Sequence, residues 1–460
     1  MGARILRIEL RRSVALWAAL VIAATGVFVL FASNEPYGSW MQLVIVSRDI
    51  MQLTWPLGLA AGAWQALRER RSKVEELMAT TPRPRWQRVL PVANAMAIAA
   101  VTAYLVMLAG AAGHVRHIDG YFPLGAIPLI ALGALAMVGA VWLGQAVGAL
   151  LPSPLTAPML AVVGFVGLAV SPMIVAQDSR DRGAVLLFPY LQGPRDGGFA
   201  LQMLSTRANL VQALWFAALA ATGLAVFAAS RPGTRLAALL PVVLGATIAV
   251  PAMPRTLSDA WVEDRRATEA VCTDDEPTVC ISRLHSYALD SMRGPAREAL
   301  SVLARKLPPG PTRVLVGNDG TPGPQPADTL IVYVTLIEST EYTADTLVEI
   351  MLDGAGVPPC AGQVGIDPNE PATREPPPEP DPRYVGARQA VTAWLLDRRP
   401  PPATGAKEEP EMALARQAFD TLAALPLDEQ RARVAAWRDA ERACSDGDRL
   451  ELLVGTGETG

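Results

Sequence analysis

The chain has 460 residues, of which 51% are hydrophobic and 18% are charged, and its mean hydropathy is +0.26. A soluble globular protein is usually less apolar and more highly charged than this. The formal net charge is −4, so the chain lacks the overall positive charge that is typical of nucleic-acid-binding proteins.

The average hides a division of the chain near residue 253. Apolar runs fill the part before it, and acids, arginines and prolines follow it at the density of a soluble domain. The sequence therefore predicts an α-helical polytopic membrane domain over residues 1–253, followed by a smaller α+β domain over residues 254–460. Many Ala, Leu, Arg, Pro and Gly residues, with few Lys and Asn, favour a GC-rich bacterial genome.

Seven apolar runs in the first domain have about the twenty residues that a helix needs to cross a bilayer core of roughly 30 Å. Four arginines precede the first run, but that run is too long for a signal peptide, so we interpret it as a retained helix. The predicted spans cover residues 13–33, 51–67, 89–113, 123–150, 156–175, 208–229 and 236–253.

Lys and Arg in the connecting loops predict the orientation, because they favour the cytoplasmic side. With the N-terminus inside, the cytoplasmic segments hold thirteen of them and the outer loops hold six. The cytoplasmic segments are 1–12, 68–88, 151–155 and 230–235, and the outer loops are 34–50, 114–122 and 176–207. We therefore predict a multi-pass protein of the inner (cytoplasmic) membrane whose second domain is extracytoplasmic.

The predicted spans contain no Asp, Glu, Lys or Arg. Carriers coupled to ions or protons commonly place ionisable groups in mid-membrane, so this class is disfavoured. The polar side chains of the spans are amides, which we interpret as helix–helix hydrogen bonds rather than as a substrate path. They are Gln52, Gln65, Asn94, Gln145, Asn209 and Gln212.

The cytoplasmic segment between the second and third spans, Arg68–Arg88, predicts a short amphipathic helix. An S-x-x-E capping box opens it and Pro82 ends it. Its apolar residues at helical spacing are Val74, Leu77 and Met78. Such a helix either lies on the lipid as part of an ordinary positively charged loop or docks into a groove on a soluble partner.

This segment resembles the one between the second and third helices of ABC-2 type permeases, the membrane subunits of one class of ATP-binding cassette (ABC) transporter. That family carries an arginine-rich run, a Glu-Leu pair and a Thr-Pro there. The matching residues are Arg70, Arg71, Glu75, Glu76, Leu77, Thr81 and Pro82. Lys73 stands where the family usually has glycine. The resemblance implies a coupling helix that contacts a separate ATPase subunit.

The outer loop 176–207 supports the same resemblance. It contains an apolar piece, Ala184–Leu191, between two charged stretches that contain glycine. ABC-2 permeases have a similar re-entrant hairpin between their fifth and sixth helices. A plain outer loop with a few buried aromatic side chains is the alternative. The resemblance covers about residues 1–230, and the seventh span and the second domain lie beyond it.

The second domain alternates helical and strand patterns. Residues rich in Val, Ile and Thr predict strands at 312–316 and 329–336. A Pro-rich stretch at 358–382 predicts a linker. Helical periodicity is found at 290–306, 344–352, 384–396, 411–425 and 428–443.

All four cysteines of the chain lie in the second domain. An even number on the oxidising side of a membrane indicates two disulfides. Among three possible pairings we prefer Cys272–Cys280 with Cys360–Cys444. Chain-entropy estimates give about 2–3 kcal/mol for the short loop and about 4–5 kcal/mol for the long one. The alternatives are four free thiols in a cytosolic tail and a zinc site, which would lack the usual C-x-x-C spacing.

The sequence contains none of the H-E-x-x-H, G-x-S-x-G, C-x-x-C and G-x-x-x-x-G-K-[ST] motifs. We therefore expect no catalytic residue, cofactor, metal site or nucleotide site in this chain. His114 and His117 are interpreted as surface residues. The acids Asp274–Glu276 are interpreted as a solvated loop between two cysteines rather than as a calcium site.

These patterns together predict the membrane subunit of an ABC-2 type exporter, which is not itself an enzyme. It would pair with an identical or a second permease in the lipid bilayer and bind a separate ABC ATPase. The alternative is a membrane sensor or scaffold whose outer domain binds a ligand. A membrane-embedded enzyme is disfavoured because paired acids and histidine clusters are missing near the spans.

Overall fold

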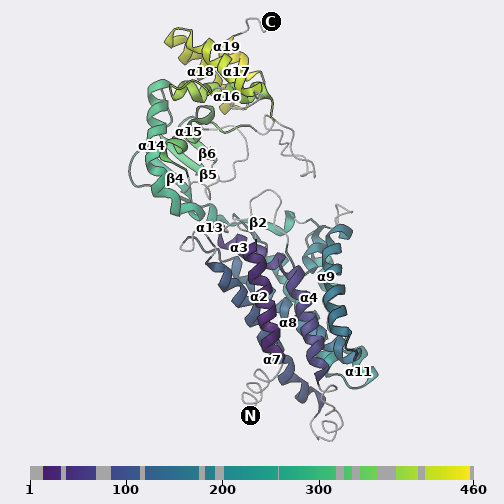
Figure 1. The fold of residues 1–460 in the computed structure, drawn as a ribbon. Coiled ribbons are helices and arrows are strands. Elements are labelled where there is room, and N and C mark those ends of the chain that lie inside the picture. Colours follow the sequence, from purple (N-terminus) through teal and green to yellow (C-terminus); the bar gives the residue numbers. More distant parts are fainter. Residues whose placement is uncertain are drawn as a thin grey trace. The chain divides into compact units, whose positions relative to one another are not determined.

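The computed structural model divides into two compact units, Met1–Asp264 and Arg265–Gly460 (Figure 1). The first unit extends past the predicted boundary at residue 253 because strand β2 (Trp261–Glu263) pairs antiparallel with β1 (Gln202–Leu204). The residues that the structure describes are 14–32, 38–68, 84–113, 115, 120–175, 182–191, 201–256, 258–317, 326–333, 342–360, 380–401 and 410–455.

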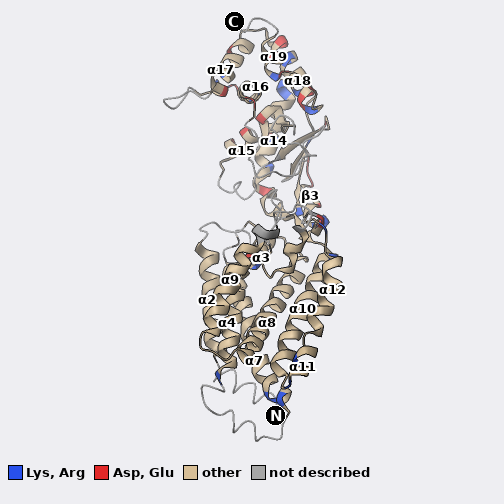
Figure 2. Ribbon diagram, turned by 90° about the vertical axis from the view of Figure 1, so that its right-hand side faces the viewer, with Lys and Arg blue, Asp and Glu red and all other residues tan. Residues whose placement is uncertain are grey.

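Apolar helices form the first unit, with one helix at each of the seven predicted positions. In chain order they are α2 (Ala15–Ala32), α4 (Met51–Ala66), α7 (Arg85–Ala112), α8 (Ala126–Leu150), α9 (Thr156–Val175), α10 (Thr206–Ala228) and α12 (Leu240–Ala252). Figure 1 shows them side by side, and in Figure 2 they are tan along almost their whole length. The first unit is thus a helical bundle with the composition of a membrane domain.

Five stretches in the described residues are long and apolar enough to cross a membrane, so the predicted number of seven is not confirmed. They are α2, α7, α8, α10 and Pro232–Ala252, which joins α11 (Pro232–Ala237) to α12. Helix α4 has 16 residues, which at about 1.5 Å per residue is shorter than a bilayer core of roughly 30 Å. Helix α9 has 20 residues, which at the same rise is about the thickness of that core, but it is not among the five.

Helices α4 and α8 pack closely because glycines line their contact. A Cβ atom added to Gly62 would lie 2.2 Å from the carbonyl oxygen of Val141, and one added to Gly144 would lie 2.0 Å from that of Leu59. Small residues at such positions allow helix backbones to approach closely inside a bilayer. The backbones of the two helices therefore lie in close contact.

A helix replaces part of the predicted outer loop 34–50. Helix α3 (Trp40–Asp49) begins at Ser39, whose hydroxyl accepts a hydrogen bond from the Gln42 backbone N–H, and runs into α4 through Ile50. Its apolar side chains are buried in the bundle, which explains why the segment is helical rather than an exposed loop. These side chains include Met41, Leu43, Val44 and Ile45.

A four-stranded sheet with the order β3-β4-β5-β6 lies in the second unit. Strand β3 (Ala270–Cys272) is antiparallel to β4 (Thr278–Ser282), whereas β4, β5 (Arg313–Gly317) and β6 (Thr329–Tyr333) are mutually parallel. Helix α14 (Leu289–Lys306) connects β4 to β5 as the crossover that parallel strands require. The mixture of helices and strands agrees with the predicted class, but the sequence analysis missed β3, β4 and the parallel order.

Helices cover the rest of the second unit, and the ends of the five predicted ones differ from the observed ends by at most two residues. Besides α14 they are α15 (Ala344–Leu352), α16 (Pro382–Leu395), α17 (Pro410–Ala423) and α18 (Leu427–Arg442). The sequence analysis missed the short helices α13 (Arg265–Thr268) and α19 (Arg449–Val454). Most of the predicted linker, residues 361–379, lies outside the described residues.

The two disulfides of the structure have the pairing that the sequence analysis preferred. Cys272 and Cys280 lie directly opposite each other on β3 and β4, with Cα atoms 4.0 Å apart. Cys360 and Cys444 join the segment after α15 to the end of α18, with Cα atoms 5.7 Å apart. All four thiols are therefore used in the structure.

Candidate functional site

An apolar cavity of about 490 Å³ lies in the first unit among α4, α8, α9, α10 and the segment 182–191. Its volume falls within the roughly 300–1,000 Å³ that is typical of small-molecule sites. The aromatic side chains in its wall are Trp55, Phe188, Trp215 and Phe216. The arrangement can hold an apolar molecule or group.

The segment 182–191 forms one side of this cavity and is packed into the bundle. It starts with a short 3₁₀ helix, Arg182–Leu187, and its side chains Leu186, Tyr190 and Leu191 are at most 1% exposed. The predicted apolar piece 184–191 is therefore largely buried in the first unit. Non-helical backbone at membrane depth is tolerated only where protein groups satisfy its polar atoms.

Three side chains from two helices satisfy the carbonyl groups of this segment. Arg48 Nε on α3 donates to the Pro189 carbonyl oxygen at 2.9 Å. On α10, Gln212 Nε2 donates to Leu186 O at 2.7 Å and Trp215 Nε1 donates to Leu187 O at 2.8 Å. Gln212, which the sequence analysis interpreted as a helix–helix contact, thus holds this segment instead.

Arg48 is the most unusual residue at the site, because its side chain is 0% exposed inside an apolar bundle. Its Nη1 lies 3.4 Å from the Leu129 carbonyl oxygen, and its guanidinium carbon lies 5.7 Å from the centre of the Phe216 ring. Among the described residues, Nη2 has no hydrogen-bond partner. A charge inside a membrane domain costs free energy and usually marks a functional element.

Sequence reasoning did not assign Arg48 a role because it placed this residue in an outer loop. The available signal was a single arginine in the otherwise mostly apolar run Met41–Met51. That signal becomes specific only when α3 is known to pack against α8 and the buried segment.

The cavity wall presents almost only carbon. The indole N–H of Trp55 donates to the Ala136 carbonyl oxygen at 3.0 Å, and that of Trp215 donates to the Leu187 carbonyl oxygen. The buried hydroxyl groups of Ser171 and Tyr190 bond to each other at 2.9 Å beside the segment. This wall offers binding to apolar groups but no nucleophile and no general acid–base pair.

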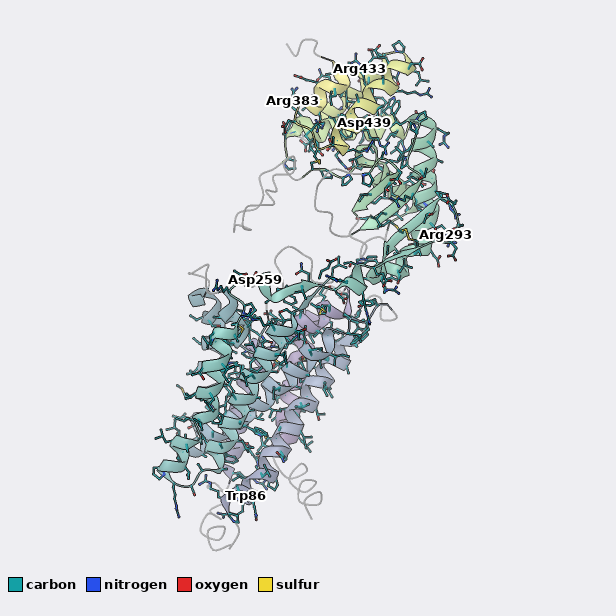
Figure 3. The ribbon with its side chains drawn as sticks, turned by 180° about the vertical axis from the view of Figure 1, so that it is seen from behind. Trp86, Asp259, Arg293, Arg383, Arg433 and Asp439 are labelled. Carbon is teal, nitrogen blue, oxygen red and sulfur yellow. A yellow bond between two sulfur atoms is a disulfide. The ribbon has the colours of Figure 1, made fainter. Side chains whose placement is uncertain are left out.

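The predicted ATPase-coupling segment lies outside the described residues, which omit 69–83. The structure therefore does not place Arg70, Arg71, Glu75, Glu76, Leu77, Thr81 and Pro82. The chain resumes before α7, where Trp86 is 56% exposed at one end of the bundle (Figure 3). Exposed tryptophan at a helix end is typical of a membrane–water interface.

The weak metal candidates receive no support from the geometry. His114 and His117 lie outside the described residues. Asp275 accepts a hydrogen bond from Arg297, and this bond lowers the pKa of its carboxyl group below the ordinary value. The described residues contain no group of three or more potential metal ligands.

The second unit contains a buried polar network centred on Glu441, which is 0% exposed. Arg449 Nε donates to Glu441 Oε2 at 2.8 Å, and the Tyr384 hydroxyl donates to Oε1 at 2.6 Å. Burial raises the pKa of Tyr384, so this hydroxyl stays protonated and can donate. Arg388 lies 3.9 Å from Glu441 and pairs with Asp353 at 2.6 Å.

This network stabilises an unusual turn. In the turn Asp353–Gly356, Ala355 has φ +52°, a conformation that favours glycine. Arg438 Nε donates to the Ala355 carbonyl oxygen at 3.1 Å, and Arg388 Nη2 donates to Val357 O at 2.7 Å. The network joins this turn to α16, α18 and α19 beside the Cys360–Cys444 disulfide, so we interpret it as structural.

Comparison of the chain with protein-family models, with curated proteins and with solved structures found no match.

Proposed function

We propose that this chain is the membrane subunit of an ABC-2 type exporter. The observation that carries the proposal is the segment 182–191, which contains only a short 3₁₀ helix and irregular backbone and packs into a bundle of apolar helices beside an apolar cavity. It stands between α9 and α10, at the place of the re-entrant element that the sequence resemblance implies.

The connectivity of α4 supports a mechanical role for the coupling segment. Helix α4 lines the cavity through Trp55 and ends at Ala66, immediately before the segment that resembles a coupling helix, and α7 starts at Arg85, just after it. Movement of residues 70–82 by an ATPase would therefore be transmitted along α4 to the cavity. Because α4 packs tightly on α8, both helices would move together.

In this mechanism two permease chains bind two copies of a separate ATPase. ATP-driven closure of the ATPase dimer pulls on the coupling segment and changes the side of the membrane to which the cavity opens. The permease itself performs no chemistry and contributes binding and movement.

When the tagged full-length chain is purified from its own cells in mild detergent, a P-loop ATPase should co-purify with it in an equimolar amount. Reversing two charges of the coupling segment, by Glu75→Lys with Glu76→Lys, should lower that recovery at least about tenfold, because like charges brought together at an interface cost several kcal/mol. Quantitative mass spectrometry measures the recovery.

Exposed acids of the second unit provide the matched control. Asp428→Lys with Asp446→Lys makes the same charge change on exposed side chains and should leave recovery of the ATPase unchanged. Failure to recover any P-loop ATPase with the unaltered chain would contradict the proposal.

The proposed orientation places the second unit outside the cytoplasm, where its two disulfides would form. Alkaline phosphatase fused after Gly455 should be active, because this enzyme folds only in an oxidising compartment, whereas a reporter that works only in the cytoplasm should be silent. The opposite pattern would mean an even number of spans and would contradict the proposed location of the second unit outside the cytoplasm.

The second unit favours one rival function, a membrane sensor or scaffold. It has its own hydrophobic core, which includes Val314, Leu347 and Trp437, and a transport bundle does not require such a unit. A sensor would bind its ligand without stimulating ATP hydrolysis by a partner. Measuring this stimulation therefore separates the two functions.

A further inference from the structure

We propose that the cavity of the first unit binds one hydrocarbon chain of an amphipathic molecule that enters sideways from the bilayer. This inference rests on the proposed exporter function, because it names the class of substrate that the cavity would hold. It is carried by the wall chemistry, the shape and the access of the cavity.

The wall chemistry favours an apolar ligand over a polar one. Both cavity tryptophans donate their indole N–H groups to backbone carbonyl oxygens, Trp55 to that of Ala136 and Trp215 to that of Leu187. The Pro189 carbonyl in the wall is occupied by Arg48 Nε. A ligand hydroxyl or amide would therefore lose its hydrogen bonds to water without replacement, whereas a hydrocarbon chain has none to lose.

The shape of the cavity suits a chain. On the α9 side, Gly167 leaves room, because an added Cβ there would have no neighbour within 4 Å. Aromatic rings form much of the remaining wall. An apolar cavity of about 150 Å³ accepts benzene, and this one is about 490 Å³, which provides room for a chain several times larger.

Access from the lipid is indicated by α9. Val163 lines the cavity and is also 58% exposed on the surface of the bundle. In a bundle of membrane-length helices, an exposed apolar side chain of this kind faces hydrocarbon. The cavity is therefore reached from the bilayer without passing through water.

Photolabelling of the full-length chain in phosphatidylcholine nanodiscs tests this inference. One arm uses hexadecanoic acid with a diazirine on its chain, and the other uses phosphatidylcholine with the same group on one acyl chain. We expect adducts, mapped by mass spectrometry, on the cavity-lining residues of α9 and of 182–191. Labelling by the first probe alone identifies a single-chain amphiphile, and labelling by the second identifies a bilayer lipid; either supports the inference.

Filling the cavity should remove this labelling. Gly167→Phe places a ring in the open space and should reduce cavity adducts at least about tenfold, the loss expected when roughly two methylene groups leave the pocket. Gly113→Phe is the matched control, because an added Cβ there also has no neighbour within 4 Å and the residue does not line the cavity. Val163→Trp replaces Gly167→Phe if that variant does not fold, because Val163 lines the cavity and its exposed position tolerates a larger side chain.

Adducts confined to outward-facing residues of α2 and α12, or cavity adducts that both blocking variants leave unchanged, would overturn the inference. The proposed function fails separately. Cavity labelling without any bound ATPase would support hydrocarbon binding in the cavity and contradict the exporter function. A bound ATPase without cavity labelling would support the exporter function and contradict hydrocarbon binding.

Discussion

Arg48→Met should loosen the segment 182–191 while the helical bundle remains folded. Arg48 donates the one hydrogen bond that the Pro189 carbonyl accepts within the part of the chain that the structure describes, and a bond from a charged donor contributes roughly 1.5–3 kcal/mol. Its loss should raise the local opening constant about 10- to 150-fold. Global stability should change less, because methionine also removes a buried charge whose Nη2 has no hydrogen-bond partner among the described residues.

Hydrogen exchange of the backbone amides in 182–191 measures this effect in the full-length chain. Arg207→Met is the matched control: Arg207 Nε also donates to a backbone carbonyl, that of Ala252 at 2.9 Å, but from an exposed position. The control should leave exchange in 182–191 unchanged. Equal exchange rates in Arg48→Met and in the unaltered chain would show that Arg48 does not hold this segment.

Glu441→Leu should destabilise the second unit by about 3–5 kcal/mol, the range measured when one partner of a buried ion pair is removed. The substitution leaves the guanidinium of Arg449, which is 3% exposed, without its carboxylate. It also removes the acceptor of the Tyr384 hydroxyl. Urea unfolding of this unit, followed by protection of the α18 amides in the full-length chain, measures the change.

A surface pair on the same helix provides the comparison. Glu429 lies one turn from Arg433 at 2.7 Å and is 46% exposed, and such i,i+4 pairs contribute about 0.3–0.5 kcal/mol. Glu429→Gln should therefore have an effect several times smaller than that of Glu441→Leu. Similar effects of both substitutions would mean that the network around Glu441 does not hold the unit together.

Local patterns were sufficient to predict most helices and both disulfides. Helix α15 has the predicted bounds, Ala344–Leu352, because its N-cap and apolar periodicity lie within ten residues. Cys272 and Cys280 are eight residues apart, and once they are paired only Cys360 and Cys444 remain, although 84 residues separate them. The helix bounds and the short disulfide loop depend on neighbours in the sequence, which the sequence displays directly.

Features that depend on distant contacts could not be predicted. The parallel order of β4, β5 and β6 requires α14 to cross over the sheet, and β4 is only five residues long. Arg48 has a role only because Pro189, far away in the sequence, lies against it. The close contact of Gly62 and Gly144 between α4 and α8 is likewise invisible before the helices are packed.

In the proposed mechanism this chain couples a separate ATPase to movement of its helices through residues 70–82. The decisive measurement is ATP hydrolysis by the co-purified complex in lipid nanodiscs. With the unaltered chain, hydrolysis should be faster than that of the isolated ATPase, and with Glu75→Lys and Glu76→Lys it should return to the isolated rate. Hydrolysis that is the same with the unaltered chain, with the charge-reversed chain and with no permease at all would rule out this coupling.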